Sequence, residues 1–470
     1  MSYDSSESAG RSEAGVPVPG GEELPRVTGP VPGARSRALA ARLTRVESRN
    51  ITRITPDDVP IFWTTARGAN VADVDGNVYV DLTGGFAVAA AGHANPRVAA
   101  AVGAQAARLA HGLGDVYPPD VKVALLERLA AVTPGDLGVT ILGSAGAEAV
   151  EAALKTALLA TGSPGVLAFT GAYHGLTYGA LACTWREDFR APFAAQLQPG
   201  VRFAPYPYAY RWPGEGDIVA AALAAVRRLV DEASASAMPI GCVLVEPIQG
   251  RGGIIVPPPG FLAGLRALCD QRRLVLVFDE IYCGLGRTGR WFACEHEGVV
   301  PDILVVGKAL SGSLPLSAAV GTARVMDAWP PSAGEAIHTS TFLGNPIACA
   351  AALAQLEEIE RRRLVERAAL LGEHLRRRLE SWCDRYPAVG DVRGRGLMQG
   401  VELVEPGSAR EPATAAAAQV VARARARGIL LLTEGPAANV LAFTPPLVIT
   451  EAQLNAALDV LEEEIARLHG

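Results

Sequence analysis

Short apolar runs alternate with longer helical segments between about residues 96 and 345. The segments EAVEAALKTALLA (148–160) and GFLAGLRALCDQRR (260–273) have the spacing of helices. The apolar runs are VTIL (139–142), GVLAF (165–169), CVLVEP (242–247), LVLVFDE (274–280) and DILVVGK (302–308). Continuous apolar strands connected by helices are typical of a mostly parallel sheet covered on both faces. We therefore predict a large α/β domain over residues 96–345.

A different pattern flanks this region. Residues 70–83 read as a hairpin around an Asp75-Gly76 turn, and we place the N-terminal part of a smaller domain at 39–95. After residue 346, helices (ACAAALAQLEEIERR) and short strands (LMQGVEL, GILLLT) predict an α+β layer, so 346–470 is the C-terminal part of that domain. Residues 1–38 are rich in Ser, Gly, Pro and Glu. Such a segment buries little apolar surface and is expected to be a disordered tail, with a docked arm as the alternative.

Composition narrows the class of protein. The 470 residues carry a net charge of −6, so the basic footprint of a nucleic-acid or anionic-membrane surface is missing. The seven cysteines are scattered, without CxxC pairs or metal spacing, which favours reduced thiols in a cytoplasm and no metal site. We find no signal peptide and no apolar stretch long enough to span a membrane.

Two charged side chains stand at predicted strand ends, where ligands bind in open α/β sheets: Asp279 and Lys308. A strand-end Lys often reaches solvent, but the apolar and Gly-rich neighbours of Lys308 favour a lowered pKa and a neutral amine, as imine formation requires. Asp279 could be a helix cap or an ion-pair partner, or it could keep a heterocyclic nitrogen protonated. A Schiff-base Lys and such an Asp are the pair that pyridoxal 5'-phosphate chemistry requires.

Two further segments are compatible with that cofactor. LGSAGAEAVEAALK (142–155) opens a helix with small residues, so the backbone amides near Gly146 and Ala147 are available to a phosphate. In FTGAYHGLTYGA (169–180), Tyr173 is placed to lie flat against a ring, although a core aromatic is the commoner explanation of a single Tyr. Each signal is weak by itself.

Taken in order, these motifs resemble the class III aminotransferases of the 4-aminobutyrate and ornithine type, which are fold-type I pyridoxal-phosphate enzymes. The resemblance covers about residues 40–468. It rests on VADVDGNVYVDLTGG, GHANP, SAGAEAVEAALK, GAYHG, VEPIQGRGG, VFDEIYCGLGRTG, DILVVGKAL, TSTFLGNP, VRGRGLMQGVEL and FTPPLVIT. It implies that 96–345 binds the cofactor, and that the enzyme moves an amino group between an amino acid or amine and a keto acid or aldehyde.

The resemblance also implies roles for individual residues. Lys308 holds the cofactor and shuttles a proton, and Asp279 pairs with the ring nitrogen. Tyr173 stacks on the ring with His174 beside it, while Gly146 and Ala147 bind the phosphate. Residues expected near the substrate are Glu246, Trp63 and Phe86. Thr341 is expected to reach the phosphate bound by the other subunit, which implies a homodimer with shared active sites.

Three positions depart from the family pattern. Ala147 stands where a hydroxyl is usual. Tyr282 replaces a Gln that bonds the phenolic oxygen of the cofactor, and its hydroxyl could serve instead. Ala442 replaces an Arg that binds a substrate carboxylate and otherwise pairs with Glu246. Without that Arg, 2-oxoglutarate is an unfavourable substrate, and Ala442→Arg is expected to improve its use.

A second activity is compatible with the same motifs. AYHG and NVLAFTPPL are similar to racemase members of the family such as α-amino-ε-caprolactam racemase. Both reactions begin with removal of a proton by Lys308, and the placement of a second acid decides between them. The alternative is therefore an amino-acid or amino-lactam racemase or epimerase. The intact Lys308 and Asp279 disfavour a non-catalytic protein.

Overall fold

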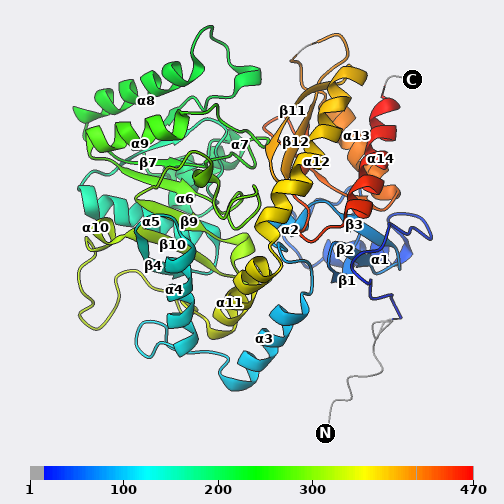
Figure 1. Ribbon diagram of the computed structural model, residues 1–470, viewed down its shortest axis with the longest axis horizontal. Coiled ribbons are helices and arrows are strands. Elements are labelled where there is room, and N and C mark those ends of the chain that lie inside the picture. Colours follow the sequence, from blue (N-terminus) through cyan, green and yellow to red (C-terminus); the bar gives the residue numbers. More distant parts are fainter. Residues whose placement is uncertain (1–14, 409, 469–470) are drawn as a thin grey trace.

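A seven-stranded, mostly parallel sheet forms the centre of the large domain in the computed structural model, which describes residues 15–408 and 410–468 (Figure 1). All neighbouring strands pair in parallel except β10 (Ser317–Thr322), which is antiparallel to both of its neighbours. The predicted α/β fold with a mostly parallel sheet is confirmed. In spatial order the strands are β4 (Leu137–Gly143), β10 (Ser317–Thr322), β9 (Ile303–Val306), β8 (Val275–Asp279), β7 (Ile240–Val245), β5 (Gly165–Phe169) and β6 (Val201–Ala204).

Both faces of this sheet are buried. On β8, Leu276 and Phe278 pack in one apolar cluster with Leu265 of α9 (Phe261–Arg272). Val275 and Val277 pack in another cluster, which includes residues of α5 (Gly146–Thr161). This explains why the strand shows no polar alternation. The helices of the large domain and its margins are α3 (Pro96–Arg108), α4 (Asp120–Val132), α5 (Gly146–Thr161), α6 (Tyr178–Cys183), α7 (Glu187–Arg190), α8 (Ile218–Ser234), α9 (Phe261–Arg272), α10 (Ala323–Met326) and α11 (Pro346–Arg361).

Two four-stranded sheets lie beside the large sheet, at the right of Figure 1. The first contains the predicted hairpin, β2 and β3, whose strands pair from Asn70 with Val80 to Ala72 with Val78. The run GILLLT is divided, because Ile429–Leu430 pairs with β3 in the first sheet and Leu432–Glu434 pairs with β15 in the second. The sheets are β1 (Trp63–Arg67), β2 (Asn70–Asp73), β3 (Val78–Asp81) and β13 (Ile429–Leu430), and β11 (Val389–Arg395), β12 (Met398–Leu403), β15 (Val440–Phe443) and β14 (Leu432–Glu434).

Helices complete these layers. The long helix α12 packs on β11, and α13 packs on α14. These elements are α1 (Ala34–Leu43), α2 (Gly84–Ala87), α12 (Leu364–Arg385), α13 (Thr414–Ala426) and α14 (Glu451–Ala466). In the described part of the chain, 3₁₀ turns occupy Ala191–Gln196, Ala209–Arg211, Ala293–His296 and Lys308–Leu310.

The N-terminal segment differs from the expectation of a disordered tail. Residues 15–38 pack on the first small sheet, with Val16 buried, while residues 1–14 lie outside the described part of the chain. Arg26 exchanges two 2.8 Å backbone hydrogen bonds with Val78. Asp75 accepts hydrogen bonds from the backbone amides of Arg35 (2.8 Å) and Ser36 (3.1 Å) at the start of α1. Polar and backbone pairing therefore orders a segment that has little apolar surface.

Three further features of the described residues concern cysteines, metal sites and membrane spans. The seven cysteines are all unpaired, and six are buried. No group of His, Cys, Asp or Glu in residues 15–408 and 410–468 has the geometry of a metal site. Among the helices of those residues, none has the length and apolarity needed to cross a membrane.

Candidate active site

A cavity of about 290 Å³ lies at the carboxyl ends of the parallel strands. Five strands direct residues into it: β4, β5, β7, β8 and β9. The cavity is lined by Gly146, Ala147, Tyr173, His174, Gly175, Leu176, Glu246, Arg251, Asp279, Ile281, Tyr282 and Lys308. Eight of the eleven candidate residues of the sequence analysis therefore meet in one place.

Lys308 stands just after β9, in a left-handed conformation with φ of +39°. A residue other than glycine adopts such a φ only where its surroundings impose it. The Nζ atom lies 4.4 Å from the centroid of the Tyr282 ring. Burial lowers the pKa of Lys308, and three nearby carboxylates oppose this effect: Asp279, Glu246 and Glu434. The amine is thus more readily deprotonated than an ordinary Lys.

Asp279 is held in a fixed orientation at the end of β8. It is 4% exposed, and its Oδ2 lies 2.7 Å from His174 Nδ1. Its Oδ1 accepts a hydrogen bond of 3.1 Å from the backbone amide of Ile281. His174 is itself anchored, because its backbone amide donates to Thr184 Oγ1 at 3.0 Å. The carboxylate is therefore positioned from both of its oxygens before any ligand arrives.

Glu246, at the end of β7, does not depend on an arginine. Its Oε1 and Oε2 accept hydrogen bonds from the backbone amides of Tyr173 (3.0 Å) and Gly250 (2.9 Å). Burial raises the pKa of Glu246 to about 7, against the opposing effect of His174. Ala442 supplies no countercharge to this carboxylate, and backbone amides bond both of its oxygens instead.

Ala442 lies in an apolar environment. It is 4% exposed on β15 and packs in a cluster with Ile254, Tyr282 and Met398. Its neighbour across the β12–β15 pair is Gly400. The position where the family carries an Arg is therefore part of an apolar wall next to Tyr282.

The start of α5 offers an anion-binding site. The backbone amides of Gly146 and Ala147 have no acceptor among the described residues. Ser144 and Ser317 secure the turn, since the amide of Ser144 donates to Glu148 (2.8 Å) and Ser317 Oγ donates to the carbonyl of Ala145 (2.7 Å). Ala147 supplies no hydroxyl, but free amides at a helix N-terminus are suited to a phosphate.

These residues fit pyridoxal 5'-phosphate. The amides at the start of α5 can hold its phosphate, Asp279 can face the ring nitrogen, and the Lys308 amine can reach its aldehyde. His174 Nε2 is buried and has no hydrogen-bond partner among the described residues. The donor set, a low-pKa amine, an oriented carboxylate and two free amides, matches the three ends of one cofactor.

The two tyrosines line the cavity differently. The Tyr173 ring lies under the guanidinium of Arg251, with the Arg251 Cζ atom 5.0 Å from the ring centroid, and meets the edge of Phe189 at 6.0 Å. Tyr282 turns the face of its ring to Lys308, and its hydroxyl interacts with Thr444. The ring of Tyr282, rather than its hydroxyl, is thus the part nearest the amine.

Three candidate residues lie outside the cavity. Thr341 is exposed in the loop before α11, and Trp63 and Phe86 are 45% and 53% exposed. Conversely, the sequence analysis missed Arg251, which lines the cavity and forms an ion pair with Glu434. The available signal was a charged residue between glycines in VEPIQGRGG, in the loop that follows the strand-end Glu246.

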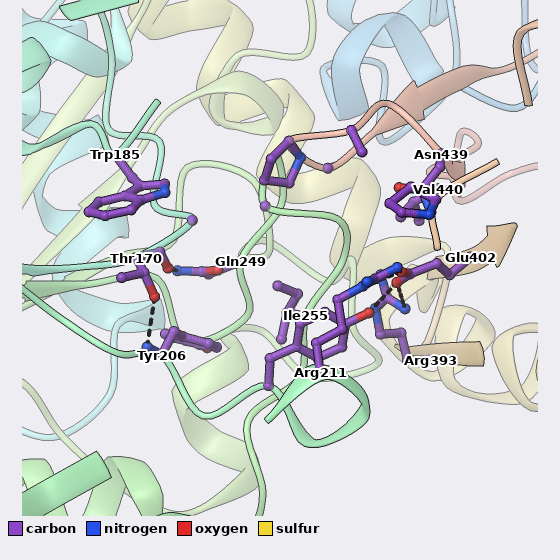
Figure 2. A pocket seen from close by; sticks show the side chains of 17 residues that line it. Thr170, Trp185, Tyr206, Arg211, Gln249, Ile255, Arg393, Glu402, Asn439 and Val440 are labelled. Atoms are coloured by element: carbon purple, nitrogen blue, oxygen red, sulfur yellow. Dashed lines mark hydrogen bonds and ion pairs between the residues drawn. The ribbon is translucent and has the colours of Figure 1, made fainter. Parts of the chain in front are cut away.

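A second cavity of about 330 Å³ is bounded in part by the loops that carry Arg251 and Glu434 (Figure 2). Gln249, Gly252 and Gly435 belong to its wall. Figure 2 shows Arg211 and Arg393 converging on Glu402, with Arg393 Nη1 2.8 Å from Glu402 Oε2. Although burial acts to raise it, these arginines and Tyr208 lower the pKa of Glu402. Two arginines of this lining therefore share one carboxylate.

Comparisons with known proteins identify the family of this chain. The family described as aminotransferase class-III matches residues 53–465. The chain is 40% identical to the 4-aminobutyrate aminotransferase GabT of Escherichia coli (strain K12), over 86% of this chain and 93% of that protein. It is 38% identical to a leucine/methionine racemase of Thermococcus litoralis, over 87% of this chain and 91% of that protein.

A solved structure is similar as well. An amine transaminase from an uncultivated Pseudomonas species, in its PLP-bound form, superimposes with a TM-score of 0.83 at 30% identity, covering 90% of this chain and 98% of that one. The chain therefore belongs to the class III aminotransferases, which are enzymes that depend on pyridoxal 5'-phosphate.

Proposed function

We propose that this aminotransferase works through Lys308, whose amine would bind the cofactor. The same amine would take a proton from the α-carbon of the substrate and deliver it to the C4′ carbon of the cofactor. The observation that carries the proposal is the convergence of Lys308 and Asp279 in one cavity, from the adjacent parallel strands β9 and β8. The bound cofactor supplies an electron-withdrawing ring. The reaction moves an amino group between an amino acid or amine and a keto acid or aldehyde.

The other residues divide into positioning and binding roles. Asp279 keeps the ring nitrogen charged, and His174 orients Asp279 through the 2.7 Å contact. The amides of Gly146 and Ala147 bind the phosphate, and Tyr173 packs on the ring. Glu246, buried and held by backbone amides, forms the floor on the substrate side. Lowering of the Lys308 pKa by burial favours the neutral amine, which is the form that accepts a proton.

A homodimer with shared active sites is part of the proposal. Thr341 sits in an exposed loop that packs on residues 110–117: Thr339 Oγ1 donates to Asp115 at 2.9 Å, and Phe342 meets the ring of His111 at 5.6 Å. Exposed apolar side chains gather on these two loops: Leu113, Val116, Tyr117 and Phe342. An exposed apolar patch of this kind favours contact with a second copy. In such a dimer Thr341 would reach the phosphate bound by the partner subunit, and the exposed Trp63 and Phe86 would line the substrate side. The composition favours a cytoplasmic enzyme.

The chain offers a direct test of the role of Lys308. Only three lysines occur: Lys122, Lys155 and Lys308. Borohydride reduction of the holoenzyme, followed by digestion and mass spectrometry, should attach the cofactor to Lys308. Lys308→Ala should lose the label and the amino transfer, whereas Lys155→Ala, an exposed lysine on α5, should retain both. Label on another lysine contradicts the proposal.

A racemase activity is the second candidate, because a leucine/methionine racemase is among the relatives. Three carboxyl groups lie around Lys308, and each is already paired: Asp279 with His174, Glu246 with backbone amides, and Glu434 with Arg251. This arrangement favours transfer over reprotonation by a second acid. Incubating single enantiomers in D₂O without a keto acid separates the two, since only a racemase then incorporates deuterium at Cα with loss of optical purity.

A further inference from the structure

A single arginine lines the cavity that holds Lys308. Arg251 follows β7 in the loop QGRGG, and its side chain is 34% exposed. Its Nε lies 3.3 Å from Oε2 of Glu434, whose side chain is only 4% exposed. The ion pair therefore has a buried carboxylate on one side and a guanidinium that remains accessible from the cavity on the other.

The backbone around Arg251 is held in place from several sides. The amide of Gly435 donates to the Arg251 carbonyl at 3.1 Å, and the amide of Gly250 donates to Glu246 at 2.9 Å. Arg393, which Figure 2 shows beside Glu402, donates to the carbonyl of Gly253 at 2.6 and 2.9 Å. A binding group on a fixed backbone loses little entropy when a ligand arrives.

The guanidinium is placed to meet a substrate rather than the phosphate. Arg251 enters from the β7 side of the cavity, whereas Gly146 and Ala147 enter from β4, and β8, β9 and β10 separate these two strands in the sheet. The planar group lies over the ring of Tyr173, 5.0 Å from its centroid. A guanidinium in such a site presents a fork of donors that matches a carboxylate.

We propose that Arg251 binds the substrate carboxylate in this enzyme, and that Glu434 is the counterion that the guanidinium leaves when that carboxylate arrives. The inference rests on the proposed function and names the substrate class, amino acids and keto acids. In this proposal the carboxylate-binding arginine stands at position 251, whereas the family pattern has it at position 442, where this chain has the apolar Ala442. A substrate that has no carboxylate leaves the Arg251–Glu434 pair intact, so the site can also accept an uncharged partner.

A purely structural role makes a different prediction. If the ion pair only joined the loops that carry Arg251 and Glu434, removing either partner would weaken all ligands equally and lower the stability. The measurement must therefore compare a carboxylate with its neutral isostere. Butyrate and butyramide differ in charge, and neither can exchange an amino group.

The test is a spectroscopic titration of the holoenzyme, following the absorption of the bound cofactor with each ligand. In the wild type, butyrate should bind at least tenfold more tightly than butyramide. Arg251→Met should weaken butyrate tenfold or more and change butyramide less than twofold. Glu434→Gln should tighten butyrate at least threefold, because the internal competitor loses its charge. Arg186→Met is the matched control, since Arg186 is a nearby cation paired with Asp188 outside the cavity lining.

Two results overturn the inference. The first is unchanged butyrate binding in Arg251→Met. The second is an equal loss of butyrate and butyramide binding in Arg251→Met together with weaker butyrate binding in Glu434→Gln. The titration needs no turnover. A holoenzyme that fails to transfer amino groups but still loses butyrate selectivity in Arg251→Met would contradict the proposed function alone.

Discussion

His174 and Asp279 come from different strand ends, β5 and β8, and meet at 2.7 Å between Nδ1 and Oδ2 in a site that is almost fully buried. The pair is 105 residues apart in the chain. The Ile281 amide bonds Oδ1 of Asp279 and the His174 imidazole contacts Oδ2, so the two contacts together fix the orientation of the carboxylate. In the proposed cofactor site, this relationship makes His174 a residue that positions Asp279.

His174→Ala should raise the dissociation constant of the cofactor at least tenfold, because Asp279 loses the partner that orients it. It should also lower the free energy of unfolding of the apoprotein by about 2 kcal/mol, the size of a hydrogen bond to a charged group. Cofactor absorption during dialysis and urea unfolding measure the two effects. His374→Ala, which removes a contact with Asn455 on α14, should leave the cofactor affinity unchanged.

Buried glutamates predict a pH dependence of stability. Burial raises the pKa of Glu280 to about 7, although it accepts hydrogen bonds from the amides of Ala293 and Cys294. The folded protein therefore keeps a proton that the unfolded chain releases near pH 4.5, so its contribution to stability falls as the pH rises from 4.5 to 7. Glu246 acts in the same direction.

Glu280→Gln should remove one of these contributions. The difference in unfolding free energy between the wild type and Glu280→Gln should decrease by roughly 3 kcal/mol between pH 4.5 and 7.5. Urea unfolding at several pH values measures it, and Glu187→Gln at an exposed position is the control. A difference that stays constant over this range would show that Glu280 is ionised throughout.

Gly175 packs directly against Ala147, in the turn that we propose binds the phosphate. Its φ is +124°, and a Cβ atom there would lie 2.6 Å from the Cβ of Ala147. Gly175→Ala should cost about 2 kcal/mol of stability and weaken cofactor binding, because Ala147 and its amide must shift. Gly216→Ala separates the two causes: its φ is +86°, but its Cβ would meet nothing within 4 Å, so cofactor binding should be preserved.

The geometry of β15 reverses the expectation for position 442. Ala442→Arg would insert a long cation into the apolar cluster of Tyr282, Met398 and Ile254 instead of improving the use of 2-oxoglutarate. We expect a loss of about 3 kcal/mol or more in unfolding free energy, from overpacking and the burial of a charge, and no gain in activity. Leu432→Arg, on the strand paired with Ala442 and 38% exposed, should change stability by less than 1 kcal/mol. A stable and more active Ala442→Arg enzyme would disprove this account.

The sequence was most informative where strands are continuous and buried. The runs that became β8 and β9 predicted that Asp279 and Lys308 stand at neighbouring strand ends, and the parallel pairing of Asp279 with Val305 confirms that arrangement. Asp279 and Lys308 are separated in the chain only by β9 and the segment that leads to it. The apolar pattern of such a short segment is sufficient to place both residues at strand ends.

Contacts between distant segments were not accessible in this way. The ion pair of Arg251 and Glu434 joins positions 183 residues apart, and the two segments carry no common pattern. The division of GILLLT between two sheets depends on partners at both ends of the chain, Val80 and Ala442. Residues 15–38 resembled a tail because their order comes from backbone pairing rather than from apolar burial.

That N-terminal arm has a practical consequence for anyone shortening this enzyme. Cutting the chain after residue 38 would strip Val78 of both hydrogen bonds to Arg26. It would also leave the side chain of Gln453 on α14 without the Glu23 carbonyl, to which it donates at 3.1 Å. A shortened protein would expose unpaired backbone groups of β3 near α14, and we expect it to aggregate during expression.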